Sequence, residues 1–498
     1  MRIALFLAGL ACFAIAPVYA KTVVFWQENF PTVESQSVGR ASLATALASE
    51  HPVFSDLDAL LQPHALAGVD LLVLPNGSAF PSDAWPEIIA YLRGGGNLLV
   101  LGGRPFRIPV ARVQGRFVPQ KPSAAYEREL GIVNTYAVPQ KDEKRFLWRH
   151  GYSFLPRLEI QASQYFVLQG RLNGLGYMLD AAGDRVAAPV VVSDHTSAGE
   201  GGMLGGRWLM LDFIPVEGYW NSQSGIALLR AAANYAGQGA ALFSIDTEFS
   251  TLKPGELPEA VVHFRNAWRQ RHNLPQTGAV TLQLLRGATV LAATQIPCSG
   301  TTVDATVQFT QNLAPGFYTL RGLYKDAGAT REFYENGFWM ENENLLASGP
   351  ALGVNGNFLT KGGEPFFPVG ANYFSTEENG WDFSGPRNAA VWERDFAEMQ
   401  RHNVSFVRTG VWGGQIKFIE SGYGGVTERF LRNVEAFLLC ARQHHIAVNF
   451  TFFAFDPQTM LRLRQTLPAV LLPGRNPYLD PVTVRSEQEY ILSIVDRF

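Results

Sequence analysis

Runs of apolar residues alternate with helical periodicity over roughly the first half of the chain. The continuous apolar runs are typical of strands that are buried on both faces of a parallel sheet. They lie at residues 22–26, 69–74, 97–101 and 207–213. Residues 82–93 place apolar side chains on one face of a helix, and a second helix is expected at 225–235. This order predicts a flavodoxin-like α/β domain over residues 21–239.

The spacing of apolar residues changes at about residue 240, from helical periodicity to alternation with polar residues. Six short runs of alternating polar and apolar residues follow, and turn sequences such as Lys253-Pro254-Gly255 separate them. This pattern predicts a β-sandwich with immunoglobulin-like architecture over residues 240–345. We expect it to orient its neighbours, with carbohydrate binding as the alternative.

Strand–helix alternation returns in residues 357–498, after a predicted hairpin turn at 361–364. Strands are expected at 366–372, 405–410 and 446–453, and helices at 389–401, 428–443 and 485–498. Thr427 is placed to cap the second helix. Repeated units of this kind predict part of a (β/α)8 TIM barrel, which needs about 250 residues when complete. We therefore expect a barrel domain that is truncated, unless another chain completes it or the fold is not a barrel.

The first twenty residues have the pattern of a signal peptide. Arg2 precedes an apolar run, and Val18-Tyr19-Ala20 resembles a cleavage site. The apolar run is too short to span a bilayer. We expect export to the periplasm or the exterior, with a mature chain that begins near Lys21.

Charge and cysteine content exclude several classes of function. The 498 residues carry a formal net charge of -3, so no basic surface for nucleic acid or membrane lipid is expected. Of three cysteines, only Cys298 and Cys440 follow the predicted leader, and they fall in different predicted domains. No metal-ligand motif or phosphate loop occurs, so we predict no metal and no cofactor.

The sequences VDLLVLPNGSAF (69–80) and YLRGGGNLLVLGG (91–103) resemble the glutamine-amidotransferase-like domains of some bacterial glycosidases. These include the trimerisation domain of certain β-galactosidases, so the resemblance implies a possible homo-oligomer. A working glutaminase needs a cysteine at the turn after the strand, where this chain has Asn76-Gly77-Ser78. We therefore expect a non-catalytic domain, and we expect Asp194-His195 to be solvated surface.

Three further sequences resemble the opening of clan A glycoside hydrolases, which include β-galactosidase, β-mannosidase and cellulase-like families. They are FLTKGGEPFFPVGANYF (358–374), SFVRTGVW (405–412) and IAVNFTFFAF (446–455). The resemblance implies hydrolysis of β-linked sugars by a retaining mechanism with two carboxylates. In that clan these carboxylates follow strands four and seven, which this chain lacks. No catalytic residue is assigned, Glu377-Glu378 are expected to be solvated, and this chain is expected to be inactive.

The resemblance also implies a partial carbohydrate site. Arg408 matches the arginine that orients the nucleophile in this clan, and Asn372 and Tyr373 would line the sugar subsite. Trp412 would stack on a sugar ring, and Asp456 would bind a hydroxyl group. The alternatives are an arginine paired with surface acids, turn-forming Asn372 and Asp456, and core packing of the two aromatic residues. A non-catalytic secreted carbohydrate-binding or assembly protein with a degenerate barrel remains the alternative function.

Overall fold

The computed structural model divides into two compact units, Met1–Ala240 and Ala241–Phe498. It describes residues 21–498 except 133–135, 138–144, 150, 153–159, 166–171, 198–202, 275–276, 299–301, 327–328, 374–382, 384, 411–425 and 453–478. The predicted signal peptide lies outside the described residues. Among those residues, no helix combines the length and the apolar character that a membrane crossing requires.

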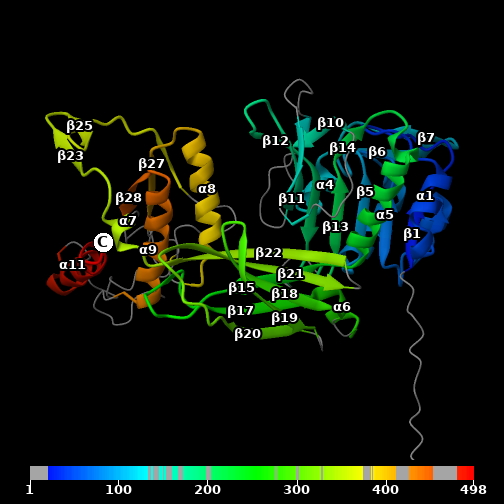
Figure 1. The fold of residues 1–498 in the computed structure, drawn as a ribbon. Helices are drawn as coiled ribbons and strands as arrows, with labels where there is room; N and C mark the ends of the chain where they lie inside the picture. The colour runs from blue at the N-terminus through cyan, green and yellow to red at the C-terminus, as the bar shows by residue number, and fades with distance from the viewer. Residues whose placement is uncertain are drawn as a thin grey trace, which may run out of the picture. The chain divides into compact units, whose positions relative to one another are not determined.

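The first unit is built on an eight-stranded sheet with the order β2-β1-β3-β5-β13-β12-β11-β9 (Figure 1). Its parallel strands are β1 (Thr22–Phe25), β2 (Val53–Ser55), β3 (Leu71–Leu74), β5 (Asn97–Leu101) and β13 (Arg207–Leu211). The antiparallel strands β12 (Arg185–Asp194), β11 (Leu172–Leu179) and β9 (Arg145–Trp148) extend it. Numbered along the chain, the parallel strands follow the order 2-1-3-4-5 of flavodoxin-like sheets.

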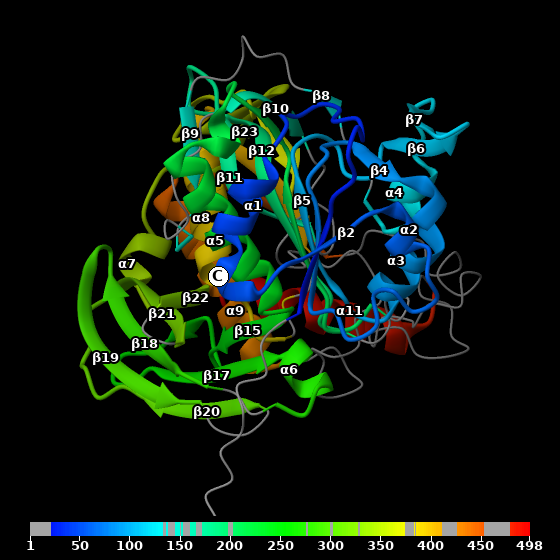
Figure 2. The same ribbon diagram turned by 90° about the vertical axis from the view of Figure 1, so that its right-hand side faces the viewer.

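Helices cover both faces of this sheet, as its apolar strands require. Figure 2 shows α1 (Arg40–Ala46) and α5 (Gln223–Gly237) on one side, and α2 (Leu57–Leu60) and α3 (Trp85–Arg93) on the other. The predicted helix 82–93 is therefore confirmed from Trp85 onward. The shorter elements are η1 (Ala48–Glu50), η2 (Ser82–Ala84), α4 (Ala125–Glu129), η4 (Tyr219–Asn221), β4 (Ala79–Pro81), β6 (Ile108–Val113), β7 (Arg116–Pro119), β8 (Tyr136–Ala137), β10 (Ile160–Tyr165) and β14 (Phe213–Pro215).

The second unit begins with two sheets that enclose one apolar core. One sheet pairs β15 (Ala241–Asp246), β17 (Glu259–Asn266) and β20 (Val303–Gln308). The other has the order β16 (Thr251–Leu252), β22 (Ala329–Met340), β21 (Gly316–Asp326), β18 (Ala279–Arg286) and β19 (Thr289–Pro297). Alternate residues of β17, β18 and β21 point into the shared core. The predicted alternation therefore forms a two-sheet sandwich, with a short helix α6 (Ala267–Arg271) at one end of β17.

Three parallel strands follow in the same unit, in the order β26 (Gly370–Asn372), β27 (Phe406–Gly410) and β28 (Ala447–Thr451). Helices α8 (Ala389–Arg401), α9 (Glu428–Gln443) and α11 (Pro481–Val495) accompany them. α7 (Glu343–Leu346) and the strands β23 (Leu352–Asn355), β24 (Phe358–Lys361) and β25 (Glu364–Pro365) precede them. The described strands form an open sheet, and no closed barrel occurs among them.

The helix predictions in this segment are largely confirmed. α8 and α9 have the expected bounds, and the Thr427 hydroxyl accepts a hydrogen bond from the Phe430 N–H at 3.2 Å. α11 starts at Pro481 rather than 485, because Asp480 caps it and proline is well suited to a first helical position.

The predicted strand 366–372 is wrong over its first half. Only Gly370–Asn372 pairs with β27, and the Phe367 side chain is 87% exposed. Pro365 and Pro368 carry no backbone N–H and cannot contribute to a hydrogen-bonded ladder there. Residues 366–369 therefore lie outside the strand and are partly or largely exposed, although they form an apolar run.

Aromatic side chains hold α8 and α9 together beneath the sheet. Phe437 of α9 is fully buried, and its ring lies 5.1–5.9 Å from four other rings. These rings belong to Tyr373, Phe383, Trp392 and Phe396. The cluster joins both helices to the end of β26.

We expect Phe437→Ala to destabilise the second unit by about 3–5 kcal/mol, because it opens a cavity in this cluster. The matched change Phe367→Ala removes an exposed ring and should shift stability by less than about 0.5 kcal/mol. Urea unfolding, followed by hydrogen exchange of α9 peptides, measures both. Equal effects of the two changes would contradict the packing described.

Candidate functional site

Three polar residues lie side by side across the parallel sheet of the second unit. The register pairs Asn372 with Arg408, and Arg408 with Asn449. Neighbours of Arg408 on β27, Val407 and Thr409, are fully buried. Because side chains alternate along a strand, Arg408 points to the opposite face, and the paired asparagines point there with it. We call Asn372, Arg408 and Asn449 the polar row.

The helices cover the other face of this sheet. Val407, Val448 and Phe450 belong to or pack against the same core cluster as the rings of α8 and α9. Asn372 and Asn449 are exposed, and Arg408 is half-buried. The polar row therefore occupies the face that the described helices leave open, with Arg408 and Asn449 in the middle of their strands.

Both the side chain and the backbone of Arg408 form hydrogen bonds. Its Nε donates a hydrogen bond to the Thr451 hydroxyl at 3.1 Å. Its carbonyl accepts one from the Tyr373 N–H at 2.9 Å. Thr451 lies two residues beyond Asn449 on β28 and so shares its face. The predicted site did not include Asn449 or Thr451, although both are polar positions within an otherwise apolar strand.

Tyr373 lies in the core rather than on the polar row. Its side chain is 4% exposed, and its ring packs 5.3 Å from Phe396 and 5.9 Å from Phe437. Its hydroxyl donates to Asp395 Oδ2 of α8 at 2.7 Å. This placement corresponds to the packing alternative and fixes the end of β26.

The remaining residues of the predicted site cannot be placed on this surface. Trp412 and Asp456, together with Glu377 and Glu378, lie outside the described residues. The strands β26, β27 and β28 contain no acidic residue. These strands therefore supply donors for a polar ligand and no carboxylate for acid–base chemistry.

The first unit also gathers polar residues at the carboxyl ends of its parallel strands. Glu34, Ser78, Arg104 and Asp212 follow β1, β3, β5 and β13 respectively. Doubly wound sheets bind ligands at this edge, where the strand order reverses. In this sheet the strand order reverses between β1 and β3, so Glu34 and Ser78 lie at the point of reversal.

Residues of the chain itself occupy the position at which such sheets bind ligands. The Ser78 N–H donates to the Val33 carbonyl at 2.8 Å, and Val33 forms a bridge with Gly77. A Cβ atom on Gly77 (φ 68°) would lie 2.0 Å from that carbonyl, so only glycine fits. Ser78 is fully buried.

The polar groups at this edge form hydrogen bonds with one another. The Ser78 hydroxyl donates to Glu34 and accepts from the Arg104 N–H at 2.6 Å, and Arg104 Nε donates to Glu34 Oε2 at 3.0 Å. Burial raises the pKa of the Glu34 carboxyl, but the hydrogen bonds from Arg104 and Ser78 outweigh burial and leave that pKa below its ordinary value. The hydroxyl at the expected nucleophile position is thus inaccessible.

The expectation that Asp194 and His195 are solvated is wrong. His195 is 1% exposed, and its ring lies 4.1 Å from the ring of Trp208. Asp194 forms a 2.7 Å ion pair with Arg207, whose side chain is fully buried. The register of β12 against β13 brings this pair together, which the local sequence does not reveal.

No family model and no curated protein match the sequence. Solved structures with partial similarity include a β-galactosidase from Rahnella sp. R3, at 12% identity and a TM-score of 0.28, over 58% of this chain and 41% of that one. A β-galactosidase from Bacillus circulans sp. alkalophilus follows at 9% and 0.27, over 57% and 41%. A Parabacteroides merdae β-glucuronidase gives 12% and 0.20, over 42% and 23%.

This chain therefore spans less than half of the length of each of these three structures. Similarity at such TM-scores assigns no family.

The side chain of Asp212 is a buried carboxyl group. It is fully buried, and neither carboxyl oxygen has a hydrogen-bond partner among the described residues. Burial raises the pKa of Asp212 well above its ordinary value, the nearby Glu34 and Glu127 raise it further, and Arg104 lowers it. A raised pKa in the folded state means that ionisation of Asp212 opposes folding as pH rises above its unfolded pKa of about 3.9.

We therefore expect Asp212→Asn to stabilise the first unit relative to the wild type at pH 7.5, with a smaller difference at pH 4.5. The difference should grow by up to about 1.4 kcal/mol per pH unit between the unfolded and folded pKa values. Urea unfolding, followed by hydrogen exchange of β13 peptides, measures it. Asp58→Asn, at an exposed carboxylate, is the control, and a pH-independent effect of Asp212→Asn would refute the assignment.

Proposed function

We propose that the polar row binds β-linked carbohydrate, as part of a secreted glycoside hydrolase of the clan A type. The observation that carries this proposal is the register of Asn372, Arg408 and Asn449 on the open face of the parallel sheet. In this proposal β26, β27 and β28 are the first strands of a TIM barrel. The catalytic carboxylates of the whole protein belong to positions outside these strands.

The chemistry of the row suits a sugar. Two amides supply both donors and acceptors, and a guanidinium supplies a planar set of donors. Hydroxyl groups of a pyranose present both kinds of partner. The link from Arg408 to Thr451 limits the motion of the guanidinium, which lowers the entropic cost of binding. Following the resemblance, Arg408 would also hold a neighbouring carboxylate in its ionised form.

The other parts of the chain receive supporting roles in this proposal. The first unit is a flavodoxin-like, amidotransferase-like domain without catalytic activity, and the buried Ser78 supports that role. It is a candidate surface for a homo-oligomer. The immunoglobulin-like sandwich orients the barrel segment. The leader at 1–20 exports the protein, and no metal or cofactor takes part.

A non-catalytic carbohydrate-binding or assembly protein is the second candidate function. The strands β26, β27 and β28 contain polar residues that can bind a sugar and no acidic residue, as both candidates allow. In that case the polar row binds sugar and the surrounding segment has lost, or never had, hydrolytic chemistry. Binding at the row is common to both candidates, and turnover separates them.

We expect Arg408→Ala to weaken binding of cellotetraose or β-1,4-galactotetraose by at least about tenfold, because hydrogen bonds to a charged group contribute about 1.5–3 kcal/mol. Asn449→Ala should weaken it by less. Arg429→Ala, on α9 and away from the row, should leave binding unchanged. Isothermal titration calorimetry of the full chain measures all three.

A release assay for reducing ends, run on the same samples, distinguishes the candidates. Release of sugar favours the hydrolase, and binding without release favours the binding protein. Absence of binding by the wild type, or equal binding by Arg408→Ala, would contradict the assignment of the polar row.

A further inference from the structure

A pocket of about 370 Å³ lies at the other edge of the parallel sheet in the second unit. It is formed by the start of β28, the end of α9, the residues after α7 and the strands β23 and β24. Its apolar lining includes Leu346, Leu352, Leu438, Ala441, Ile446 and Val448. A volume of this size falls within the range of pockets that bind small molecules. The polar row lies on the opposite face of the sheet and none of its residues lines this pocket, so the pocket is a separate feature.

All charged side chains among the described lining residues are basic. They are Lys361 and Arg442, and His445 also lines the pocket. No carboxylate in the described part of the chain forms an ion pair with Arg442 or Lys361. An apolar pocket with basic side chains at its wall favours an anion that carries an apolar body.

Arg442 is held in a fixed position. Its Nε donates to the Ser348 hydroxyl at 3.3 Å. Its guanidinium packs against Gly349 (φ 96°), where a Cβ atom would lie 1.4 Å from a terminal nitrogen. Neither terminal nitrogen has a hydrogen-bond partner among the described residues. The planar donors of a guanidinium match the geometry of a carboxylate.

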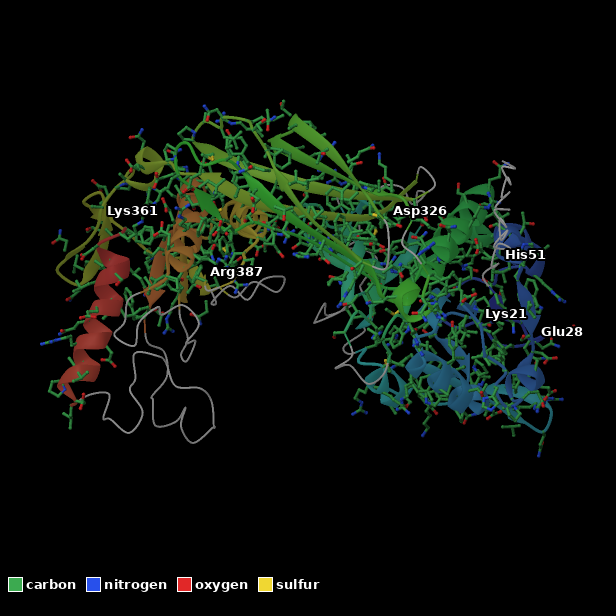
Figure 3. The ribbon with its side chains drawn as sticks, turned by 90° about the horizontal axis from the view of Figure 1, so that it is seen from below. Lys21, Glu28, His51, Asp326, Lys361 and Arg387 are labelled. Carbon is green, nitrogen blue, oxygen red and sulfur yellow. The ribbon has the colours of Figure 1, made fainter. Side chains whose placement is uncertain are left out.

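Lys361 brings a second positive charge from a different element. It ends β24, where Figure 3 labels it, and its Nζ lies 3.5 Å from the His445 carbonyl and 5.4 Å from the Phe366 ring centroid. The negative end of the α9 dipole accounts for basic residues on α9 itself, such as Arg442. Lys361 is not part of that helix and adds charge beyond it.

We propose that this pocket binds a small amphiphilic carboxylate. The carboxylate is held by Arg442 and Lys361, and the apolar body lies against Leu352, Leu438 and Val448. This site is independent of the carbohydrate site and of its proposed function.

Calorimetric titration of the full chain with 4-phenylbutyrate tests the proposal, with neutral 4-phenylbutan-1-ol as the matched ligand. We expect the acid to bind at least tenfold more tightly than the alcohol. Arg442→Gln should abolish that preference, and Lys361→Gln should reduce it. Arg429→Gln, on the same helix but outside the pocket, should preserve it. Circular dichroism checks that each variant is folded.

If Arg442→Gln does not fold, two other experiments test the role of charge in binding. One is the Lys361→Gln variant, and the other is a titration of the wild type at 0.5 M NaCl, since both reduce the effect of charge. Equal binding of acid and alcohol, or an unchanged preference in Lys361→Gln, would overturn the proposal. So would the absence of acid binding at 10 mM.

Discussion

The packing of α8 and α9 against one face of the parallel sheet determines the chemistry of the second unit. Phe437 of α9 contacts rings of α8 and the ring of Tyr373 at the end of β26, and the apolar residues of β27 and β28 complete the same core. Once that face is covered, alternation along the strands sends Arg408 and its paired asparagines to the other face. The site is thus a consequence of how the core is filled.

α9 also connects this sheet to the sandwich. Arg432 is nearly buried and forms ion pairs with Glu256 at 2.6 Å and with Glu428 at 2.8 Å. Trp339 of β22 donates its indole N–H to the Cys440 sulfur at 3.1 Å. These contacts give the helix polar partners on the side that faces the sandwich, and they account for the compactness of the second unit. The polar groups of the two parallel sheets differ in their accessibility. Ser78, Glu34 and Arg104 bind one another at the carboxyl ends of the strands in the first unit, whereas the polar row lies on an open face of the sheet in the second.

The sequence predicted those features that depend on local chemistry. Helices α8 and α9 follow from their apolar periodicity and from the cap at Thr427. The first half of strand 366–372 failed because two prolines outweighed its apolar character. The burial of His195 and the alignment of Asn449 with Arg408 depend on strand register, which joins residues far apart in the chain. The sequence allows Tyr373 either to pack in the core or to line a binding site. Its contact with Phe437 in the folded structure places it in the core.

In the proposed function, a β-linked oligosaccharide binds the polar row on the open face of β26, β27 and β28. Hydrogen–deuterium exchange of the full chain, with and without saturating cellotetraose or β-1,4-galactotetraose, measures this binding at the peptide level. We expect slower exchange in peptides that contain Asn372, Arg408 and Asn449, with no change in the sandwich or the first unit. Protection confined to the sandwich or to the first unit would contradict it.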